Sequence, residues 1–421
     1  MQKKTKDKRP RGDRIIRLPL LHEEYIQFVT DRFFAKKEID RQYSEHPELF
    51  PVDFACGYVL NGFTDCSVKQ GCRHRRIRVD AGKVTFTIEP AFLMPYMTAL
   101  TEDVEKVLFL RRFNVPYRGL TYVFGRNNMF RYRQEQALGR FNLVGTTVKS
   151  PENLPRDLLA DEKHTSRCGE KQYIAMTVAK ECVFGAELTE SASEFSLKEA
   201  YRVFADEARS VNPEYAPESV NTDGWLPTQN VWKQLFPKIT IILCFLHAFI
   251  KIRDRAAKVL KESFTQVSEK VWNAYQAENK ASFAQRLRRL KEWASTQVPD
   301  SPMKEHIMEL CANRHRFISS YDHKNAHRTG NMVDRLMKFI DRACFDSMYF
   351  HGTLETGNRR VRALALLWNF CPSSPATVRK HNGKSCPAER LNGKRYDDVW
   401  LNNLLVSASM NGNSGYQQNP L

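Results

Sequence analysis

The sequence lacks the patterns that mark several common classes of protein. No apolar run reaches the roughly 18 residues that a membrane-spanning helix needs, so we predict no membrane partner. No Gly-x-x-x-x-Gly-Lys segment is present, so ATP is not expected as a ligand. The charged first residues are not followed by the apolar core of a secretion signal. We therefore predict a cytoplasmic protein, associated with the nucleoid if its host is a prokaryote.

The ten cysteines also lack a pattern, because no two of them form a Cys-x-x-Cys pair. Close pairs of this kind fix the tetrahedral geometry of most structural zinc sites. Cys56, Cys66, Cys72 and His74 fall within 19 positions, and both zinc binding and ordinary thiols remain open for them. We otherwise expect reduced thiols. No Ser/His/Asp or Cys/His arrangement indicates nucleophilic catalysis by a side chain.

Positive charge is what the sequence has in excess. Lysine and arginine total 65 against 48 aspartate and glutamate residues, which gives a formal net charge of +17. An excess of this size favours a polyanionic partner, DNA or RNA, over a merely solvated basic surface. Residues 1–14 are themselves basic, and we expect a flexible arm that either follows phosphates or only aids solubility.

The hydrophobic pattern changes several times along the 421 residues, which is enough chain for two or three domains. Helical periodicity gives way to short strands, then to helices, then to alternating strands and helices, and then to helices again. We divide the chain into a basic arm and small α+β lead-in (1–95), a helix-turn-helix region (96–148), the first part of an α/β core (149–250), an all-α insertion (251–325), and the rest of the core with a C-terminal region (326–421).

Three short helical segments are predicted between Thr101 and Gly139, with Gly125 at the turn before the third and with Met129 and Tyr132 pointing inward. This pattern resembles a helix-turn-helix, in which the start of the second helix of the pair enters the major groove of DNA. A plain structural bundle is the alternative. Arginine and asparagine pair with guanine, adenine and phosphate. The exposed positions that we predict to contact DNA are Arg126, Asn127, Asn128, Arg131 and Arg133.

The segment from residue 157 to residue 244 predicts three strands, a helix, a strand, a helix and a strand. That is the element order of the ribonuclease H-like fold. Asp161 is expected at the end of the first strand and Asp223 at the end of the fourth. If these two strands are neighbours in the sheet, their carboxylates lie side by side, and a helix packed on the sheet can deliver a third.

Three carboxylates in one small space repel one another unless cations lie between them. Mg²⁺ and Mn²⁺ are hard ions that prefer oxygen ligands. Two such ions, roughly 4 Å apart, can activate an attacking oxygen and neutralise a leaving oxygen in phosphoryl transfer. The predicted cofactors are therefore two Mg²⁺ or Mn²⁺ ions.

Four segments together carry a resemblance to a known family: "LLADEKHT", "VNTDGW", "CFLH" and "HRTGNMVDRLM". The chain from about residue 158 to residue 400 resembles the DDE/D transposases of the Mutator-like superfamily, in which a helical insertion interrupts a ribonuclease H-like core before the last acid. The resemblance places the catalytic and metal-binding acids on Asp161, Asp223 and Asp334. It places the family's Cys/Asp-x-x-His signature on Cys244 and His247, which we expect to be structural supports.

The last acid departs from the family, because most members have glutamate there and Asp334 is one methylene shorter. Glu355 is the alternative, with the expected side chain but without the preceding motif. Near the first acid, Glu162, Lys163 and His164 are candidates for contact with the flanking phosphate. Trp225 is read either as a core residue or as a stacking partner for an unpaired base. The arginines Arg359, Arg360 and Arg362 are expected to bind phosphate or to pair with acids.

The resemblance implies a DNA transposase that binds terminal inverted repeats and cuts and joins strands of double-stranded DNA. Because two element ends must be joined to a target, we expect a homodimer or a larger assembly. Two alternatives stay open: a catalytically inactive descendant that regulates through DNA binding, and a structure-selective nuclease of the same fold.

Overall fold

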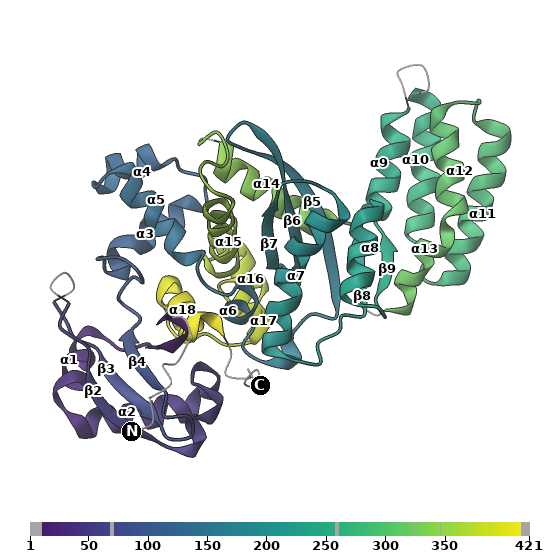
Figure 1. Ribbon diagram of the computed structural model, residues 1–421. Coiled ribbons are helices and arrows are strands. Elements are labelled where there is room, and N and C mark those ends of the chain that lie inside the picture. Colours follow the sequence, from purple (N-terminus) through teal and green to yellow (C-terminus); the bar gives the residue numbers. More distant parts are fainter. Residues whose placement is uncertain (1–10, 68–70, 257–260, 324, 346, 414–421) are drawn as a thin grey trace.

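The computed structural model describes residues 11–67, 71–256, 261–323, 325–345 and 347–413 (Figure 1). The first ten residues of the predicted basic arm lie outside these ranges. The chain forms a mixed α/β structure with two separate sheets, so the predicted α/β class is confirmed at that level. In Figure 1 a small sheet, a larger sheet with helices on both sides, and a bundle of helices follow one another across the molecule.

The smaller sheet has the strand order β1-β4-β3-β2, in which β1 is parallel to β4 and the other neighbours are antiparallel. Its core includes Phe28 and Ile39 from two helices, and it also includes Val406 and Met410 from much later in the chain. The lead-in is therefore completed by the C-terminal region. Its elements are β1 (Ile15–Leu18), α1 (His22–Thr30), α2 (Arg32–Glu45), β2 (Tyr58–Phe63), β3 (Arg75–Val79) and β4 (Thr85–Pro90).

Three helices follow the small sheet, at the positions that the sequence predicts. Gly125 ends the second helix with a positive φ of +68°, a conformation that glycine adopts without a Cβ clash. The third helix packs against a helix of the larger unit, and a fully buried short helix then leads into that unit. The four helices are α3 (Thr101–Arg111), α4 (Tyr117–Phe124), α5 (Asn128–Leu138) and α6 (Leu143–Thr147).

The larger sheet has the order β7-β6-β5-β8-β9. Its first three strands form an antiparallel meander, and β5, β8 and β9 run parallel. The predicted strands and the helices between them all occur in this unit. They are β5 (Asp157–Arg167), β6 (Glu170–Ala179), β7 (Cys182–Thr189), α7 (Glu194–Val211), β8 (Ser219–Thr222), α8 (Leu226–Leu235) and β9 (Thr240–Leu243).

Helices cover both faces of this sheet, which explains why its strands read as nearly continuous apolar runs. Leu158 packs with α7 and α8 on one face, and the next residue, Leu159, packs with helices α14 and α15 on the other. Side chains alternate between the faces along a strand. The helices on the second face and after it are α14 (Asn331–Phe345), α15 (Leu354–Phe370), α16 (Pro375–Lys380), α17 (Pro387–Asn392) and α18 (Trp400–Ser407).

The helical bundle lies between β9 and α14 in the chain and has its own apolar core, which includes Phe245, Phe283 and Phe317. The regular elements in the described part of the predicted insertion are thus all helices, and the first of them begins before residue 251. Its helices are α9 (Phe245–Asp254), α10 (Lys261–Tyr275), α11 (Lys280–Gln297), α12 (Pro302–Ala312) and α13 (Arg314–Ile318).

Short 3-10 helices complete the described elements. They are η1 (Arg11–Arg14), η2 (Pro47–Leu49), η3 (Val52–Cys56), η4 (Pro151–Asn153), η6 (Ser319–Asp322) and η7 (Ser409–Gly412). None of the helices in the described part of the chain is long and apolar enough to cross a membrane.

Candidate metal centre

Asp161 lies in the middle of a strand. It is the fifth of the eleven residues of β5, so the prediction that the strand ends there is wrong. The strand continues because β5 and β6 form a long antiparallel pair as far as Arg167, whereas the parallel pairing of β5 with β8 stops at Leu159. Asp161 therefore lies where one neighbouring strand ends and leaves an opening beside β5.

Asp223 lies in that opening. The last parallel pair joins Leu159 of β5 to Asn221 of β8. Asp161 and Asp223 each come two residues later, so they lie level with one another. The chain turns directly after Asp223, with a φ of +105° at Gly224. The backbone N–H of Trp225 donates to the Asp223 carboxylate at 2.9 Å and fixes its position.

Asp334 comes to the same place from α14, where it lies in the first turn. The segment before this helix is tied to the sheet by three hydrogen bonds. The amide of Asn221 donates to the carbonyl of His327 at 2.9 Å, and the N–H of Phe245 donates to the carbonyl of Arg328 at 3.0 Å. The N–H of Gly330 donates to the sulfur of Cys244 at 3.0 Å. Cys244 thus helps to hold the segment before α14 in place.

The three predicted acids meet in two overlapping groups. The carboxylate oxygens of Asp161, Glu162 and Asp223 lie within 4.8 Å of one another. Oxygens of Asp161 and Asp334 and a ring nitrogen of His247 form a second group with the same spacing. Asp161 belongs to both. No lysine or arginine among the residues that the structure describes forms an ion pair with Asp161, Asp223 or Asp334.

Burial and mutual repulsion act on the acids of this site. Burial, and then the carboxylates of Asp223, Glu162 and Asp334, raise the pKa of Asp161 to about 8. Burial also raises the pKa of Glu162 to about 7, against the hydrogen bonds that Tyr201 and Thr228 donate to it at 2.6 and 2.7 Å. Burial and the neighbouring carboxylates thus both disfavour the charged forms of these acids.

His247, which was predicted to be a structural support, lies beside the acids. It lies in the first turn of α9, three residues after Cys244, and it faces the acids rather than only supporting the fold. The Cys244 sulfur, and then Asp223 and Asp334, raise its pKa against the effect of burial. Its Nδ1 is buried and makes no hydrogen bond with any described residue. The sequence signal for this position was the Cys244-x-x-His247 spacing directly after a buried strand, which puts the imidazole near the end of that strand.

The set of carboxylate oxygens and one imidazole nitrogen suits a hard divalent cation. Oxygen ligands are typical of Mg²⁺ and Mn²⁺, and imidazole binds transition metals more readily. The acids come from β5, from the turn after β8 and from α14, and no arginine or lysine in the described ranges forms an ion pair with them, so the residues fit such ions. Held this way, two ions would share Asp161.

Glu355 lies elsewhere. It is exposed in the first turn of α15, forms an ion pair with Arg359, and lines a different hollow together with Gly139 and Arg362. It takes part in neither of the two groups around Asp161. The structure therefore does not bring Glu355 to the other acids.

The basic residues near the acids have partners of their own. Lys163 lies 3.9 Å from Asp341, and the ring of His164 packs on Tyr173. Trp225 is half-exposed, with its indole N–H 3.4 Å from the carbonyl of Ala192. The three arginines of α15 pair with acids rather than facing solvent freely: Arg359 with Glu355, Arg360 with Glu135, and Arg362 with both Glu187 and Glu207.

The predicted DNA-contacting positions, which lie just before α5 and in its first turns, divide into two kinds. Arg126, Asn127, Asn128 and Arg133 are exposed, and the Asn127 side chain also caps α5 by accepting from the N–H of Phe130. Arg131 is only 4% exposed, so its prediction as an exposed contact is wrong. Its guanidinium donates to the carbonyls of Phe124 and Gly125 at 2.7 and 3.0 Å and holds the turn. Met129, predicted inward, is exposed, because α5 turns its buried face toward α15.

The cysteines of the lead-in show no metal-binding arrangement within the described ranges. The Nδ1 atom of His74 lies 2.8 Å from the hydroxyl of Tyr25, and Cys56 and Cys66 are exposed. No group of potential ligands that the structure describes contains these cysteines. A third group does occur at the opposite end of the large sheet, formed by Asp157, Glu218 and His323, but there Ser219 donates to Asp157 and Arg156 pairs with Glu218.

Comparison with models of known protein families gives no match, and comparison with curated proteins gives no significant match.

Proposed function

We propose that the protein is a DNA transposase with a ribonuclease H-like core, in which Asp161, Asp223 and Asp334 bind two divalent cations. The observation that carries this proposal is the meeting of three acids, 62 and 111 positions apart in sequence, at one edge of a sheet, with no ion pair to a basic residue in the part of the chain that the structure describes. The strand order and the helical insertion before the last acid support it. So does the net charge of +17, which suits a nucleic acid.

Each residue of the candidate metal centre would have a separate role in binding the ions. Asp161 is common to both ligand groups and would hold the two ions together. Asp223 and Glu162 belong to one of these groups, and Asp334 and His247 belong to the other. Ions bound here activate the attacking oxygen and neutralise the leaving oxygen of a phosphate. Tyr201 and Thr228 keep Glu162 oriented, and Cys244 keeps the start of α14 against the sheet.

The α4–α5 pair would bind the terminal repeats as a helix-turn-helix, through the exposed residues Arg126, Asn127, Asn128 and Arg133. A homodimer or larger assembly would then hold two ends together.

The test is Mg²⁺- or Mn²⁺-dependent cleavage and strand joining on DNA that carries the sequences flanking the gene. We expect Asp161→Asn and Asp334→Asn to lose both reactions by at least about a thousandfold while DNA binding remains, because each removes a metal ligand. Glu355→Gln is the matched control and should cut normally. Full activity in Asp334→Asn, or a dead Glu355→Gln, contradicts this assignment of the third acid.

Two other functions give different outcomes in the same assay. A regulator without catalysis would bind the ends and cut nothing, even with intact acids. A structure-selective nuclease would cut branched DNA without preferring the ends.

A further inference from the structure

Three side chains with metal-binding atoms meet at the end of the large sheet opposite to the candidate metal centre. Asp157 is the first residue of β5, Glu218 directly precedes β8, and His323 directly follows η6. Their ligand atoms lie within 4.8 Å of one another. Asp157 comes four residues before Asp161 in the same strand, which places the two residues roughly 13 Å apart along it. The three side chains therefore form a group of their own, separate from the candidate metal centre.

Each carboxylate of this group has one oxygen held by a neighbouring side chain. The hydroxyl of Ser219 donates to Oδ1 of Asp157 at 2.6 Å, and the guanidinium of Arg156 donates to Oε1 of Glu218 at 2.9 Å. The other oxygen of Glu218 lies 3.6 Å from Nδ1 of His323. Hydrogen bonds of this kind orient the side chains that bind metals in proteins. They leave the second oxygen of each carboxylate for a shared ligand.

The carboxylate of Asp157 is buried without a cation beside it. The residue is only 9% exposed, and none of the described lysines and arginines forms an ion pair with it. A buried charge needs a counter-charge, because its removal from water costs free energy. Arg156 pairs with Glu218 instead, and its side chain is exposed, so water screens its charge. A divalent cation between Asp157 and Glu218 would supply the missing positive charge.

The three ligands indicate which cations fit. Imidazole nitrogen suits Zn²⁺ and other transition ions, whereas Mg²⁺ and Ca²⁺ prefer oxygen ligands alone. Ligands around a tetrahedral Zn²⁺ lie about 3.4 Å from one another, which is close to the 3.6 Å between His323 and Glu218. Glu218 is exposed and His323 is partly exposed, so a water molecule can reach the fourth position.

We propose that Asp157, Glu218 and His323 bind one Zn²⁺ or a similar divalent transition ion. Both carboxylates belong to the sheet, whereas His323 belongs to the segment that returns from the helical insertion to α14. The ion would fix this segment to the start of the sheet. Hydrogen bonds at the carbonyl of His327 and at the N–H of Gly330 hold the same segment further along. The proposal does not depend on the proposed function, because none of the three ligands belongs to the candidate metal centre.

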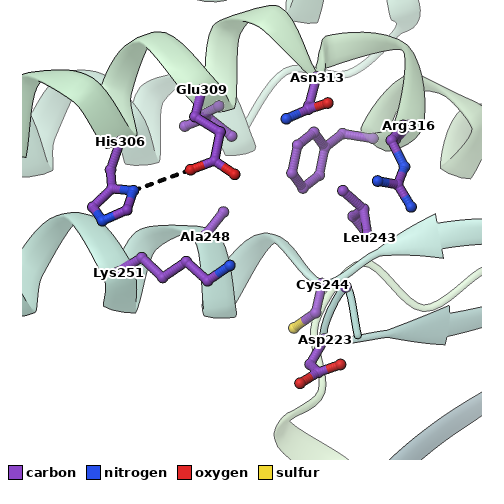
Figure 2. Close-up of a pocket in the computed structure, with 12 residues that line it drawn as sticks. Asp223, Leu243, Cys244, Ala248, Lys251, His306, Glu309, Asn313 and Arg316 are labelled. Atoms are coloured by element: carbon purple, nitrogen blue, oxygen red, sulfur yellow. Dashed lines mark hydrogen bonds and ion pairs between the residues drawn. The ribbon is translucent and has the colours of Figure 1, made fainter. Parts of the chain in front are cut away.

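The test measures Zn²⁺ uptake by the full chain after its metals have been removed with a chelator. Competition with a chromophoric chelator gives the number of ions bound per chain. We expect His323→Ala to bind one ion fewer than wild type, because it lacks the imidazole ligand. His306→Ala is the matched control, since His306 also pairs with a glutamate, Glu309, but lies on α12 (Figure 2). It should bind as many ions as wild type.

Two other variants separate this site from the metal centre and from a loss of folding. Asp161→Asn should keep the ion that His323→Ala loses, because it changes only the metal centre. Glu218→Gln lies at an exposed position, so it should fold normally and lose the same ion as His323→Ala.

Amide hydrogen exchange gives a second readout. In wild type, Zn²⁺ should slow exchange in residues 325–330 several-fold, because the ion fixes this segment to the sheet. The effect should be absent from both His323→Ala and Glu218→Gln.

Equal Zn²⁺ uptake by wild type, His323→Ala and Glu218→Gln overturns the proposal and leaves His323 and Glu218 as an ion pair only. Uptake that is lost in Asp161→Asn, but kept in His323→Ala, places the ion at the metal centre and overturns it too. If wild type cuts no DNA while the uptake that depends on His323 persists, the proposed function fails and this inference stands.

Discussion

Two arginines of α5 have opposite surroundings although they are two positions apart. Arg131 is buried and donates to the carbonyls at the end of α4, whereas Arg133 is exposed. Arg131→Ala should lower the free energy of unfolding by about 1–2 kcal/mol, because it removes the hydrogen bonds to the part-buried carbonyls of Phe124 and Gly125. Arg133→Ala should change stability by less than about 0.5 kcal/mol and should weaken binding to the ends. Urea unfolding and DNA titration of both variants check this, and equal stability of the two contradicts the assigned role of Arg131.

Lys149 is a second residue whose surroundings give a measurable effect. The residue is partly buried, and its ammonium group donates to the carbonyls of Gly145 and Ser407. Burial lowers the pKa of Lys149 to about 7. An unfolded lysine keeps its proton up to about pH 10, so between pH 7 and pH 10 the unfolded chain binds a proton that the folded chain lacks. The free energy of unfolding therefore rises with pH in that window.

Comparison with Lys149→Met isolates this contribution. From pH 7 to pH 9 the stability of wild type should rise by up to about 2 kcal/mol relative to the variant, because a pKa difference is worth about 1.4 kcal/mol per unit. Urea unfolding at both pH values measures it. A constant difference between the two proteins would show that Lys149 stays charged in the folded state.

At the scale of elements, one buried glutamate joins four helices. Glu135 of α5 is fully buried and pairs with Arg111 of α3 at 2.7 Å and with Arg360 of α15 at 3.6 Å. Both arginines also donate to the carbonyl of Ala343 in α14. The three-helix region is therefore attached to the large unit through a charged junction.

Removing this carboxylate should be costly. We expect Glu135→Ala to lower the free energy of unfolding by about 3–5 kcal/mol, because two arginines would stay buried without their anion. Glu355→Ala breaks an exposed pair with Arg359 on α15, and it should cost less than about 1 kcal/mol. Thermal or urea unfolding of both variants gives the comparison, and a similar small loss in each contradicts the role of the junction.

The sequence predicted elements better than their contacts. The apolar runs of β5 to β9 and the periodic helices were predictable, because burial on two faces leaves a continuous pattern. The burial of Arg131 was not predictable, because the periodicity of α5 does not reveal that carbonyls at the end of α4 accept hydrogen bonds from this side chain. The acids could be brought together only by assuming the strand order of the sheet. His247 was predicted to be a structural support, because sequence spacing does not reveal the direction in which an imidazole ring points.

At the scale of the whole molecule, the net charge of +17 predicts salt-sensitive binding. Each phosphate contact releases counterions, so affinity for duplex DNA of unrelated sequence should fall at least about tenfold between 50 and 200 mM salt. Fluorescence anisotropy over a salt series measures the slope. A flat dependence would show that the positive charge serves solubility instead.

The shared core of the small sheet has a consequence for how the protein is made. The backbone N–H of Arg17 in β1 donates a hydrogen bond to the hydroxyl of Ser409, 392 positions later. Val406 and Met410 belong to the apolar core of the same sheet. At roughly 5–20 residues per second, a ribosome needs about 20–80 s to cover that interval. The sheet that is synthesised first is therefore among the last parts to be completed. A nascent chain interrupted before residue 406 would carry an uncovered apolar face that chaperones and proteases recognise.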